Sequence, residues 1–416
     1  MPRSVCIVGS GSLASNPRLL KEAGALHEAG YDVTTVSCDY TDALVATDDE
    51  IARSVPWRVR RVPRPALGRY TTRVARMVAG LSEAAGIAVP VGLAAEAYGG
   101  PARVLRHAVD RVAADLYVAH YVPSLPATAA AARRHGALLA FDAEDFHPGE
   151  GTGGAEDALR MKMVGRIERA TLPACAYVTA ASPLIGRAYV ERYRIGAPTT
   201  VLNVFPLGMK PATEASLPPA NGTLLRAYWF SQTIGLDRGL QAFVQAMACT
   251  STEVTLDLRG SNRWGHGDTL LAMARDLGIG GRVRLLPLAP PDEMVKLSSA
   301  YDLGLSLETD VSESRRLCLT NKIFTYILAG VPVMMSDTPA QQALAPDLGH
   351  AAAIVSLGDV EGIARALERL ATAPALTAAK SVADRLGRDR YNWDREKHVL
   401  LETVDAAFAR RPGAQA

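Results

Sequence analysis

The chain has 416 residues, of which 48% are hydrophobic and 21% are charged. A chain of this length exceeds what one hydrophobic core usually supports, so we expect two domains of roughly 200 residues each. Its 45 lysines and arginines nearly balance 43 aspartates and glutamates. The resulting net charge of +2 excludes a global field that would capture nucleic acid, so any anion must be bound by a local group of residues.

Cysteine usage and hydropathy bear on where the protein works. The five cysteines are scattered without a CxxC pair, and the first residues lead directly into a predicted strand, which favours a reducing cytoplasm. No run reaches the ~18 to 20 apolar residues of a membrane span. The most apolar stretch, residues 84–97, follows Arg69, Arg73 and Arg76. We expect it to form a helix pair packed in the core, with peripheral contact to a membrane surface or an apolar acceptor as the alternative.

Strand-length apolar runs alternate with helical patterns along the first half of the chain. Residues 4–8, 18–30 and 32–37 predict a strand, a helix and a strand, which is one βαβ unit. Further strands are predicted at residues 116–119, 137–141 and 177–179, and further helices at residues 127–135 and 155–171. Strands separated by helices predict a parallel sheet covered on both faces.

The alternation stops near residue 203, where prolines and glycines concentrate, and restarts near residue 224. We therefore assign an N-terminal domain to residues 1–205, a linker to residues 206–222 and a second domain to residues 223–390. In the second domain, strands are predicted at 224–230, 254–260, 283–286 and 303–307, and helices at 240–247 and 269–277. Both halves thus predict an α/β fold with a doubly wound sheet.

A glycine-rich loop follows the first predicted strand. Residues 9–14 read GSGSLA, which formally matches the GxGxx(G/A) pattern. However, Asn16 and Pro17 predict that the helix begins later than in a dinucleotide-binding fingerprint, and no acidic residue ends the second strand at the expected spacing. The loop still borders the crevice where such sheets bind ligands. Its candidate contacts to an acceptor or to donor phosphates are Gly11, Ser12, Asn16 and Arg18.

The start of a helix near residue 321 predicts an anion site. Residues 318–321 precede the helix directly, and Lys322 lies in its first turn. Helix N-terminal N–H groups and one or two cations are what a diphosphate requires. A lysine there opposes the helix dipole unless an anion compensates it. This pattern favours a ligand role for Leu319, Thr320, Asn321 and Lys322; pairing of Lys322 with an acid such as Glu313 is the alternative.

Several segments carry the patterns of one enzyme family. Residues 15–18 read SNPR, residues 30–33 read GYDV, residues 231–240 read SQTIGLDRGL, residues 321–326 read NKIFTY, residues 329–333 read AGVPV, and residues 391–393 read YNW. Together they resemble the family 4 glycosyltransferases over almost the whole chain. The donor half, from SQTIGLDRGL onwards, carries the most specific part of this resemblance.

The resemblance implies the GT-B fold, in which two Rossmann-like domains face a central cleft. The terminal helix, residues 391–416, then crosses back and completes the first domain. It also implies transfer of a sugar from a nucleotide-diphosphate donor, most often a UDP- or GDP-sugar, to a small natural product or a glycan. Retention of anomeric configuration and independence from metals and other cofactors are further expectations. A homodimer is compatible with this reading, and no nucleic acid partner is expected.

The donor-site positions of the family are only partly preserved. Its diphosphate-binding Arg and Lys match Gln232 and Arg238, so one cation is kept and Lys322 would restore the other. Thr233 beside Gln232 is a further donor contact.

The two glutamates of the family match Leu317 and Thr325, so the usual acids near the ribose and the donor sugar are missing. Glu308 and Glu313 are the available substitutes, and Thr325 occupies the ribose-side position. Either acid would equally serve as an ordinary loop residue.

An acidic cluster follows the predicted strand at 137–141. Glu144, Asp145 and His147 lie within four residues of one another, and such groups usually face a cleft because they cannot all be buried without partners. Many relatives have a histidine at the position of Glu144. We predict that the three side chains orient the acceptor or the sugar hydroxyls, while their spacing is poor for a metal.

Two other classes of function remain open. The missing glutamates and the glutamine at position 232 allow a catalytically silent binding or scaffold protein of the same fold. An epimerase of nucleotide sugars on the same architecture is the third reading.

Overall fold

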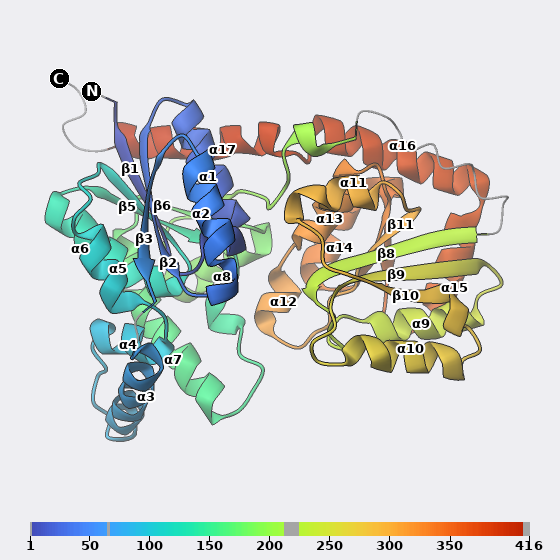
Figure 1. Ribbon diagram of the computed structural model, residues 1–416, viewed down its shortest axis with the longest axis horizontal. Coiled ribbons are helices and arrows are strands. Elements are labelled where there is room, and N and C mark those ends of the chain that lie inside the picture. Colours follow the sequence, from blue (N-terminus) through green and yellow to red (C-terminus); the bar gives the residue numbers. More distant parts are fainter. Residues whose placement is uncertain (1, 65–66, 212–223, 411–416) are drawn as a thin grey trace. The chain divides into compact units, whose positions relative to one another are not determined.

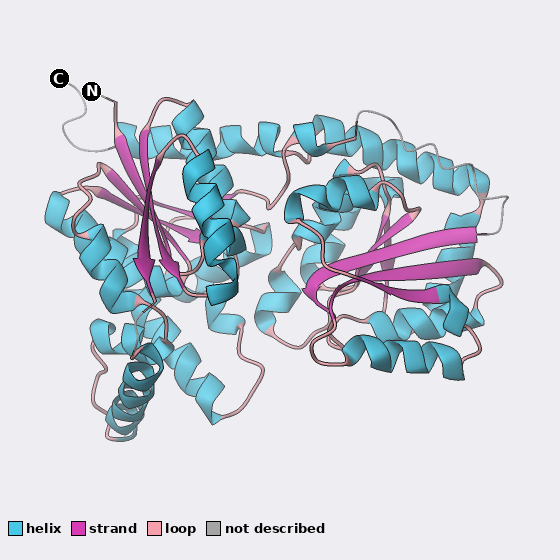
Figure 2. Cartoon of the chain, in the orientation of Figure 1, coloured by secondary structure: helices cyan, strands magenta, loops and turns pink. Residues whose placement is uncertain are grey.

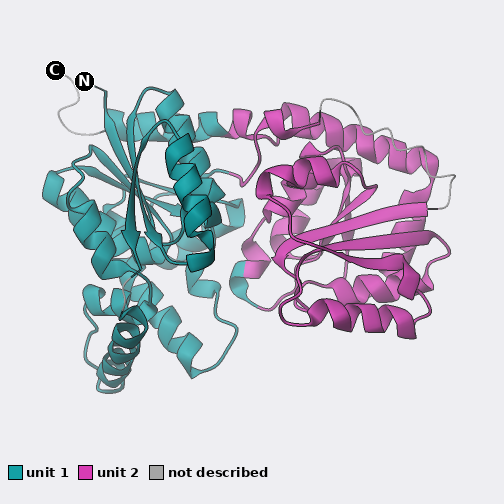
Figure 3. Cartoon of the chain, in the orientation of Figure 1, with its two compact units in different colours: residues 1–201, 312–314, 397–416 teal, residues 202–311, 315–396 magenta. Residues whose placement is uncertain are grey.

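A computed structural model describes residues 2–64, 67–211 and 224–410 of the chain (Figure 1). The chain divides into two compact units (Figure 3). The first unit comprises residues 1–201, 312–314 and 397–416, and the second comprises residues 202–311 and 315–396. Of the predicted linker, residues 212–222 lie outside the described residues. Residue 223, where the second domain is predicted to begin, lies outside them as well.

The first unit is built on a seven-stranded parallel sheet with the order β3-β2-β1-β4-β5-β6-β7. Its strands are β1 (Ser4–Gly9), β2 (Asp32–Asp39), β3 (Arg58–Pro63), β4 (Leu116–His120), β5 (Leu138–Ala143), β6 (Tyr177–Ala180) and β7 (Thr199–Thr200). In β1 every residue after Ser4 is buried. Such a continuous apolar strand is expected because helices cover both faces of the sheet (Figure 2).

Eight helices surround this sheet in the described part of the first unit before residue 201. They are α1 (Pro17–Glu28), α2 (Val45–Ser54), α3 (Gly68–Ala84), α4 (Val91–Tyr98), α5 (Ala102–Val109), α6 (Leu125–His135), α7 (Ala155–Thr171) and α8 (Pro183–Tyr193). Helix α1 begins where the sequence predicts, because the Asn16 side chain accepts a hydrogen bond from the Leu19 N–H at 3.0 Å and Pro17 takes the first helical position.

The second unit contains a six-stranded parallel sheet with the order β10-β9-β8-β11-β12-β13. Its strands are β8 (Leu224–Thr233), β9 (Glu253–Ser261), β10 (Val283–Leu286), β11 (Leu303–Ser306), β12 (Val333–Ser336) and β13 (Ala352–Val355). The helices of this part of the chain are α9 (Leu240–Cys249), α10 (His266–Asp276), α11 (Met294–Ser298), α12 (Glu313–Leu317), α13 (Asn321–Leu328), α14 (Pro339–Leu348), α15 (Val360–Ala371), α16 (Ala373–Asp389) and α17 (Trp393–Ala409).

Helix α17 belongs to the first unit from Lys397 onward. The ring of Phe408 near its end stacks on Tyr31 at 5.9 Å between centroids, and the guanidinium of Arg3 lies over the same ring. These contacts supply the partner surface that the apolar repeat of this helix requires. Among the described residues, no helix combines the length and hydropathy needed to cross a membrane.

The order of strands reverses at one point in each sheet. In the first unit the reversal lies between β1 and β4, and in the second it lies between β8 and β11. Doubly wound sheets bind ligands at this switch point, beyond the carboxyl ends of the strands. The residues after these four strands are therefore the ones to inspect for a site.

Candidate active site

One buried carboxylate at the switch point of the second unit forms ion pairs with three basic side chains. Glu308 lies two residues beyond β11 and is 2% exposed. Its Oε2 accepts hydrogen bonds from Arg238 Nη1 at 3.2 Å and from Arg315 Nη1 at 2.9 Å, while Lys322 Nζ lies 3.1 Å from Oε1. Asp237 Oδ1 also lies 3.6 Å from Arg238 Nε, so three positive side chains meet two negative ones and the group keeps an excess of positive charge. We name Arg238, Glu308, Arg315 and Lys322 the cation cluster.

The charge state of the cation cluster follows from its contacts. Burial raises the pKa of Glu308, but Lys322, Arg315 and Arg238 outweigh burial and lower the pKa to about 2. Glu308 is therefore ionised at neutral pH and fixes the cations in place. The Lys322 side chain is 9% exposed, Arg238 19% and Arg315 31%, so the arginines keep surface that can meet a ligand.

Close packing positions the helix that carries Lys322. A Cβ atom on Gly304 would lie 2.2 Å from Cγ of Tyr326, so glycine in β11 makes room for the tyrosine of α13. The Tyr326 hydroxyl donates to the Tyr228 carbonyl of β8 at 3.0 Å. The body of α13 is thereby held against the two strands that flank the switch point.

The loop that carries Arg238 is held to the same place. Gly239 has φ of +62°, in the left-handed region that favours glycine, and a Cβ there would lie 2.9 Å from that of Leu307. Thr309 Oγ1 also donates to the Asp237 carbonyl at 2.7 Å. Asp237 and Gly239, the two neighbours of Arg238 in the β8–α9 loop, thus both contact the segment after β11.

A pocket of about 480 Å³ adjoins the cation cluster within the second unit. Its lining comes from the carboxyl ends of β11, β12 and β13 and includes Glu308, Asp337 and Thr338. Thr338 is buried, and its Oγ1 has no hydrogen-bond partner within the described chain. Gln341, which is buried and does not line the pocket, also has an Nε2 without a hydrogen-bond partner among the described residues. A pocket of this size with unsatisfied polar atoms suits a small polar ligand.

The predicted anion cradle lies at the first turn of α13. Asn321 and Lys322 open this eight-residue helix after Thr320, whose Oγ1 lies 3.0 Å from Ser306 Oγ at the end of β11. Leu319 is buried just before the helix. Thr325 is fully buried, and its hydroxyl donates to the Asn321 carbonyl at 2.9 Å. The Thr325 hydroxyl, predicted at the ribose side, therefore hydrogen-bonds within α13, one turn beyond the residues of the predicted anion cradle.

The remaining donor-side predictions have different surroundings. Gln232 is exposed and Thr233 half-buried at the end of β8, where a bulge interrupts the pairing with β9. A bulge at a strand end redirects side chains and is common beside binding sites. Glu313 opens α12, and among the described residues Lys322 pairs with Glu308 rather than with Glu313.

The first unit buries a second charged network at its own switch point. Arg18 donates to both oxygens of Asp142, each at 2.7 Å, and to the Val201 carbonyl at 2.7 Å. His120, the last residue of β4, lies 2.7 Å from Glu22 Oε2 and 3.4 Å from Asp142 Oδ2. Burial raises the pKa of Asp142, but Arg18 and His120 outweigh it and lower the pKa to about 2. Arg18, which is predicted to bind a ligand, thus forms a buried ion pair with Asp142.

The other loop residues predicted to contact a ligand also have internal partners. Ser12 is buried and its Oγ accepts from the Thr41 N–H at 3.4 Å, while the Gly11 carbonyl accepts from the Cys38 N–H at 3.3 Å. Asn16 caps α1, as described above. The structure therefore shows these groups anchoring the loop to β2 and the segment after it.

Tyr121 follows β4 directly and holds one of the predicted acids. Its hydroxyl donates to Glu144 Oε2 at 2.9 Å. Its backbone has φ of 64° and ψ of 149°, a region that is costly for any residue with a side chain and that is often found at functional sites. Asp145 is half-buried, and its carbonyl accepts from the Tyr189 hydroxyl at 3.4 Å.

His147 lies three residues beyond Glu144 but is buried. Its Nδ1 lies 2.7 Å from Glu150 Oε1, and its Nε2 has no hydrogen-bond partner within the described residues. Burial lowers the pKa of His147, but Glu150 and other nearby carboxylates outweigh burial and raise it to about 9. At neutral pH the ring therefore carries both protons and donates from Nδ1 to Glu150, which disfavours a role as a base.

Sequence reasoning missed several of the residues that these two sites contain. Arg315, Tyr121, His120 and Thr338 were not singled out. A usable signal existed for three of them, because His120 and Tyr121 follow a buried strand, and Thr338 follows the strand Val333–Ser336 and precedes a proline at the start of a helix.

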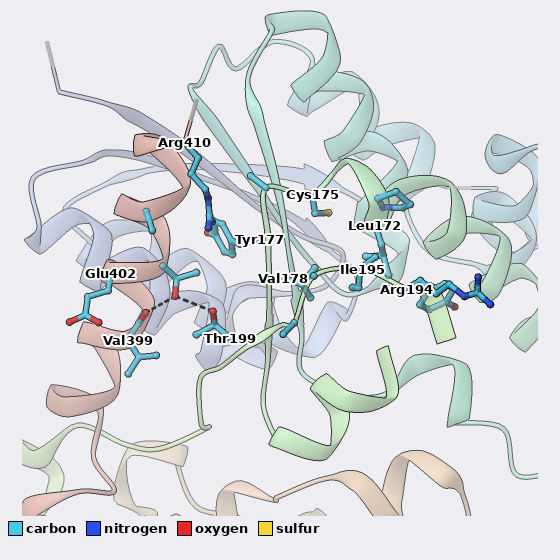
Figure 4. Close-up of a pocket in the computed structure, with 17 residues that line it drawn as sticks. Leu172, Cys175, Tyr177, Val178, Arg194, Ile195, Thr199, Val399, Glu402 and Arg410 are labelled. Carbon is cyan, nitrogen blue, oxygen red and sulfur yellow. Dashed lines mark hydrogen bonds between the residues drawn. The ribbon is translucent and has the colours of Figure 1, made fainter. Parts of the chain in front are cut away.

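A further pocket, of about 750 Å³, lies elsewhere in the first unit (Figure 4). Its lining includes Tyr177 at the start of β6, Thr199 of β7, and Glu402 and Arg410 near the end of the chain. Thr199 is the strand partner of Thr179, whose hydroxyl donates to Asp142 at 2.5 Å. Arg18, His120 and Asp142 are not among its lining residues, so the pocket adjoins the strands of the charged network without containing its side chains.

Solved structures share this arrangement along almost the whole chain. HepE from Anabaena, in complex with UDP and glucose, matches with a TM-score of 0.70 and 15% identity, over 97% of this chain and 100% of its own. The chain has the GT-B fold. A glycosyltransferase from Rickettsia africae has a TM-score of 0.68 at 10% identity, covering 99% and 100%. Sucrose-phosphate synthase from Thermosynechococcus elongatus has 0.66 at 15%, covering 98% and 100%.

The GT-B fold is thus the established part of the expectation. No protein-family model matches the sequence, and no curated protein matches it either. At identities of 10% to 15% these structural matches establish architecture rather than activity, so function must be argued from the sites.

Proposed function

We propose that this protein is a glycosyltransferase that uses a nucleotide-diphosphate sugar. The observation that carries the proposal is the cation cluster, because it places three cations, in excess of the acids that they contact, at the switch point of a GT-B second unit. HepE, which shares the fold, is known in complexes with UDP and with UDP-glucose. A UDP-sugar is therefore the first donor to test, followed by a GDP-sugar.

In this proposal each part of the second unit has a distinct role. Arg238, Arg315 and Lys322, with the first amides of α13, bind the diphosphate and stabilise the negative charge that develops as the bond to the sugar breaks. Glu308 holds those cations in position. The adjoining pocket, with Thr338 and Asp337, accepts the hydroxyl groups of the sugar or of the ribose.

The acidic segment after β5 supplies the acceptor side of the reaction. Glu144 is oriented by Tyr121 and would hydrogen-bond an acceptor or sugar hydroxyl, with Asp145 beside it. His147, which is protonated, would stabilise negative charge nearby rather than remove a proton. We assign the acceptor to small natural products or glycans, and the transfer to the retaining class of hexosyltransferases in family 4.

The remaining expectations belong to the same proposal. No metal or other cofactor is assigned a role, because the cations of the cluster supply the positive charge that a bound metal would otherwise provide. A cytoplasmic location and a homodimer are retained as proposals. The first domain is proposed to end near residue 205 and to be completed by residues 391–416.

The test is a thermal-shift series with UDP, GDP, ADP and dTDP and the corresponding sugar nucleotides. We expect one diphosphate to raise the melting temperature and its sugar nucleotide to raise it further. The selected donor is then incubated with an acceptor library and followed by mass spectrometry. The absence of any shift would refute the donor site.

The same measurements separate the other two readings. A stable complex that yields neither transfer nor slow donor hydrolysis identifies a silent binding protein. Conversion of the sugar nucleotide to its epimer without an acceptor identifies an epimerase. Transfer to an acceptor with the anomeric configuration inverted would refute the retaining assignment alone, leaving the donor site intact.

A further inference from the structure

Helix α3 of the first unit turns an apolar face to solvent. Tyr70, Val74, Met77 and Leu81 recur at spacings of four, three and four residues, which places them along one side of the helix. Tyr70 is 67% exposed, Met77 61% and Leu81 66%. A helix at a protein surface normally shows the reverse pattern, with polar side chains outward. The name outer face is used below for these four residues.

The opposite side of α3 explains why the outer face is free. Ala75 and Ala79 are buried, and Arg76 donates to the Ala97 carbonyl of α4 at 2.9 Å. Small residues therefore pack α3 onto α4, and Figure 1 shows the two helices together at one end of the first unit. Within residues 84–97, where the sequence predicts a core helix pair, the structure has one helix that begins there, α4; its Ala94, Ala95 and Ala97 are buried, whereas Ile87 before it is 61% exposed.

The charged residues that flank the outer face along α3 are arginines, whereas the one acid of this helix, Glu83, is paired with Arg166 and Lys162 of α7. Residues 58–82 contain seven arginines and no aspartate or glutamate, although the whole chain is nearly neutral. Arg69 and Arg73 lie on α3 and are exposed, and neither has an ion-pair partner among the described residues. Because α3 has 17 residues, the apolar outer face and the arginines beside it extend over a length of about 25 Å.

We propose that α3 binds the surface of a membrane that contains anionic phospholipids. The outer face would enter the boundary between headgroups and acyl chains, while Arg69 and Arg73 would meet lipid phosphates. A protein partner would require a matching acidic and apolar surface, and a second copy would bring the same arginines together. Opposite charge therefore favours an anionic lipid surface over both. This binding is independent of the proposed transfer reaction.

The experiment is co-sedimentation of the full chain with vesicles, one set of phosphatidylcholine alone and one containing phosphatidylglycerol. We expect binding to the anionic set that weakens as salt is raised. Met77→Ser combined with Leu81→Ser should lower the partition coefficient by at least about tenfold, because two exposed apolar side chains no longer insert. Leu277→Ser combined with Leu288→Ser, two exposed leucines of the second unit, is the matched control and should bind normally.

A second pair of variants tests the charge. Arg69→Glu with Arg73→Glu should abolish the preference for anionic vesicles, whereas Arg133→Glu with Arg134→Glu on α6 makes the same change in net charge and should preserve it. Failure of the wild-type chain to bind anionic vesicles would overturn the proposal. So would equal losses in test and control variants. Sedimentation velocity that shows Met77 and Leu81 mediating dimerisation, without vesicle binding, would assign the outer face to self-association instead.

Discussion

Removal of single cations from the cluster around Glu308 should weaken binding of a nucleoside diphosphate. We consider Arg238→Met and Lys322→Met, which keep an apolar stem but delete the charge. In either variant Glu308 retains two cations, so its carboxylate stays paired and the fold should persist. A hydrogen bond to a charged group is worth about 1.5 to 3 kcal/mol, so each variant should bind roughly 10- to 150-fold more weakly. The double variant should lose less than the sum, since both cations share Glu308.

Titration calorimetry with the diphosphate selected by thermal shift measures these losses. Arg284→Met is the matched control, because Arg284 pairs with Asp257 at 2.7 and 2.8 Å in the same unit but lies within β10. Asp257 keeps the Tyr301 hydroxyl at 2.7 Å in that variant, so its binding should equal that of the wild type. Affinities within twofold of wild type for both Arg238→Met and Lys322→Met would refute the placement of the donor.

Three further outcomes are expected. Tyr121→Phe should lower kcat at least about tenfold with unchanged donor affinity, because the carboxylate it orients loses a hydrogen bond; an unchanged kcat would show that the contact is only structural. The folded pKa of His147 is raised from 6.5 to about 9, so its stabilisation, about 3 kcal/mol, is complete below pH 6.5 and is lost towards pH 9. Melting curves of wild type and His147→Gln should converge over that range, and parallel curves would contradict this. Gly304→Ala should lower the free energy of unfolding, measured with urea, by about 3 kcal/mol. Gly281→Ala should leave it unchanged, because the space around its Cβ is open. Equal losses in the two variants would disprove the packing argument.

Much of the fold was predictable because strands and helices leave strong periodic signals. The helix at 155–171 and the strand at 283–286 have the predicted bounds. The region between residues 40 and 115 was largely unassigned. Its strand β3 reads RVRRVP at the sheet edge, where half-exposed arginines replace the apolar run, and the outer face of α3 inverts the usual pattern of burial.

The candidate site was predictable one residue at a time but not as an arrangement. Lys322 followed from a local signal, whereas Arg238 and Glu308 followed from the resemblance to family 4. Arg238 and Glu308 are 70 residues apart and meet because β8 and β11 are neighbours. The interpretation of Glu308 as a ligand for hydroxyl groups stays untested, and its carboxylate is engaged by cations. The backbone strain at Tyr121 could not be foreseen, since φ there depends on tertiary packing.

The carboxylate of Glu308 has a consequence for turnover in the proposed reaction. A nucleoside diphosphate is the product as well as part of the donor, and three uncompensated cations would retain it long after the sugar has left. Glu308 removes one unit of that charge and remains beside the cations when the product departs. In the proposed reaction it would act as a resident counter-ion that shortens the residence time of the product, at the cost of some donor affinity.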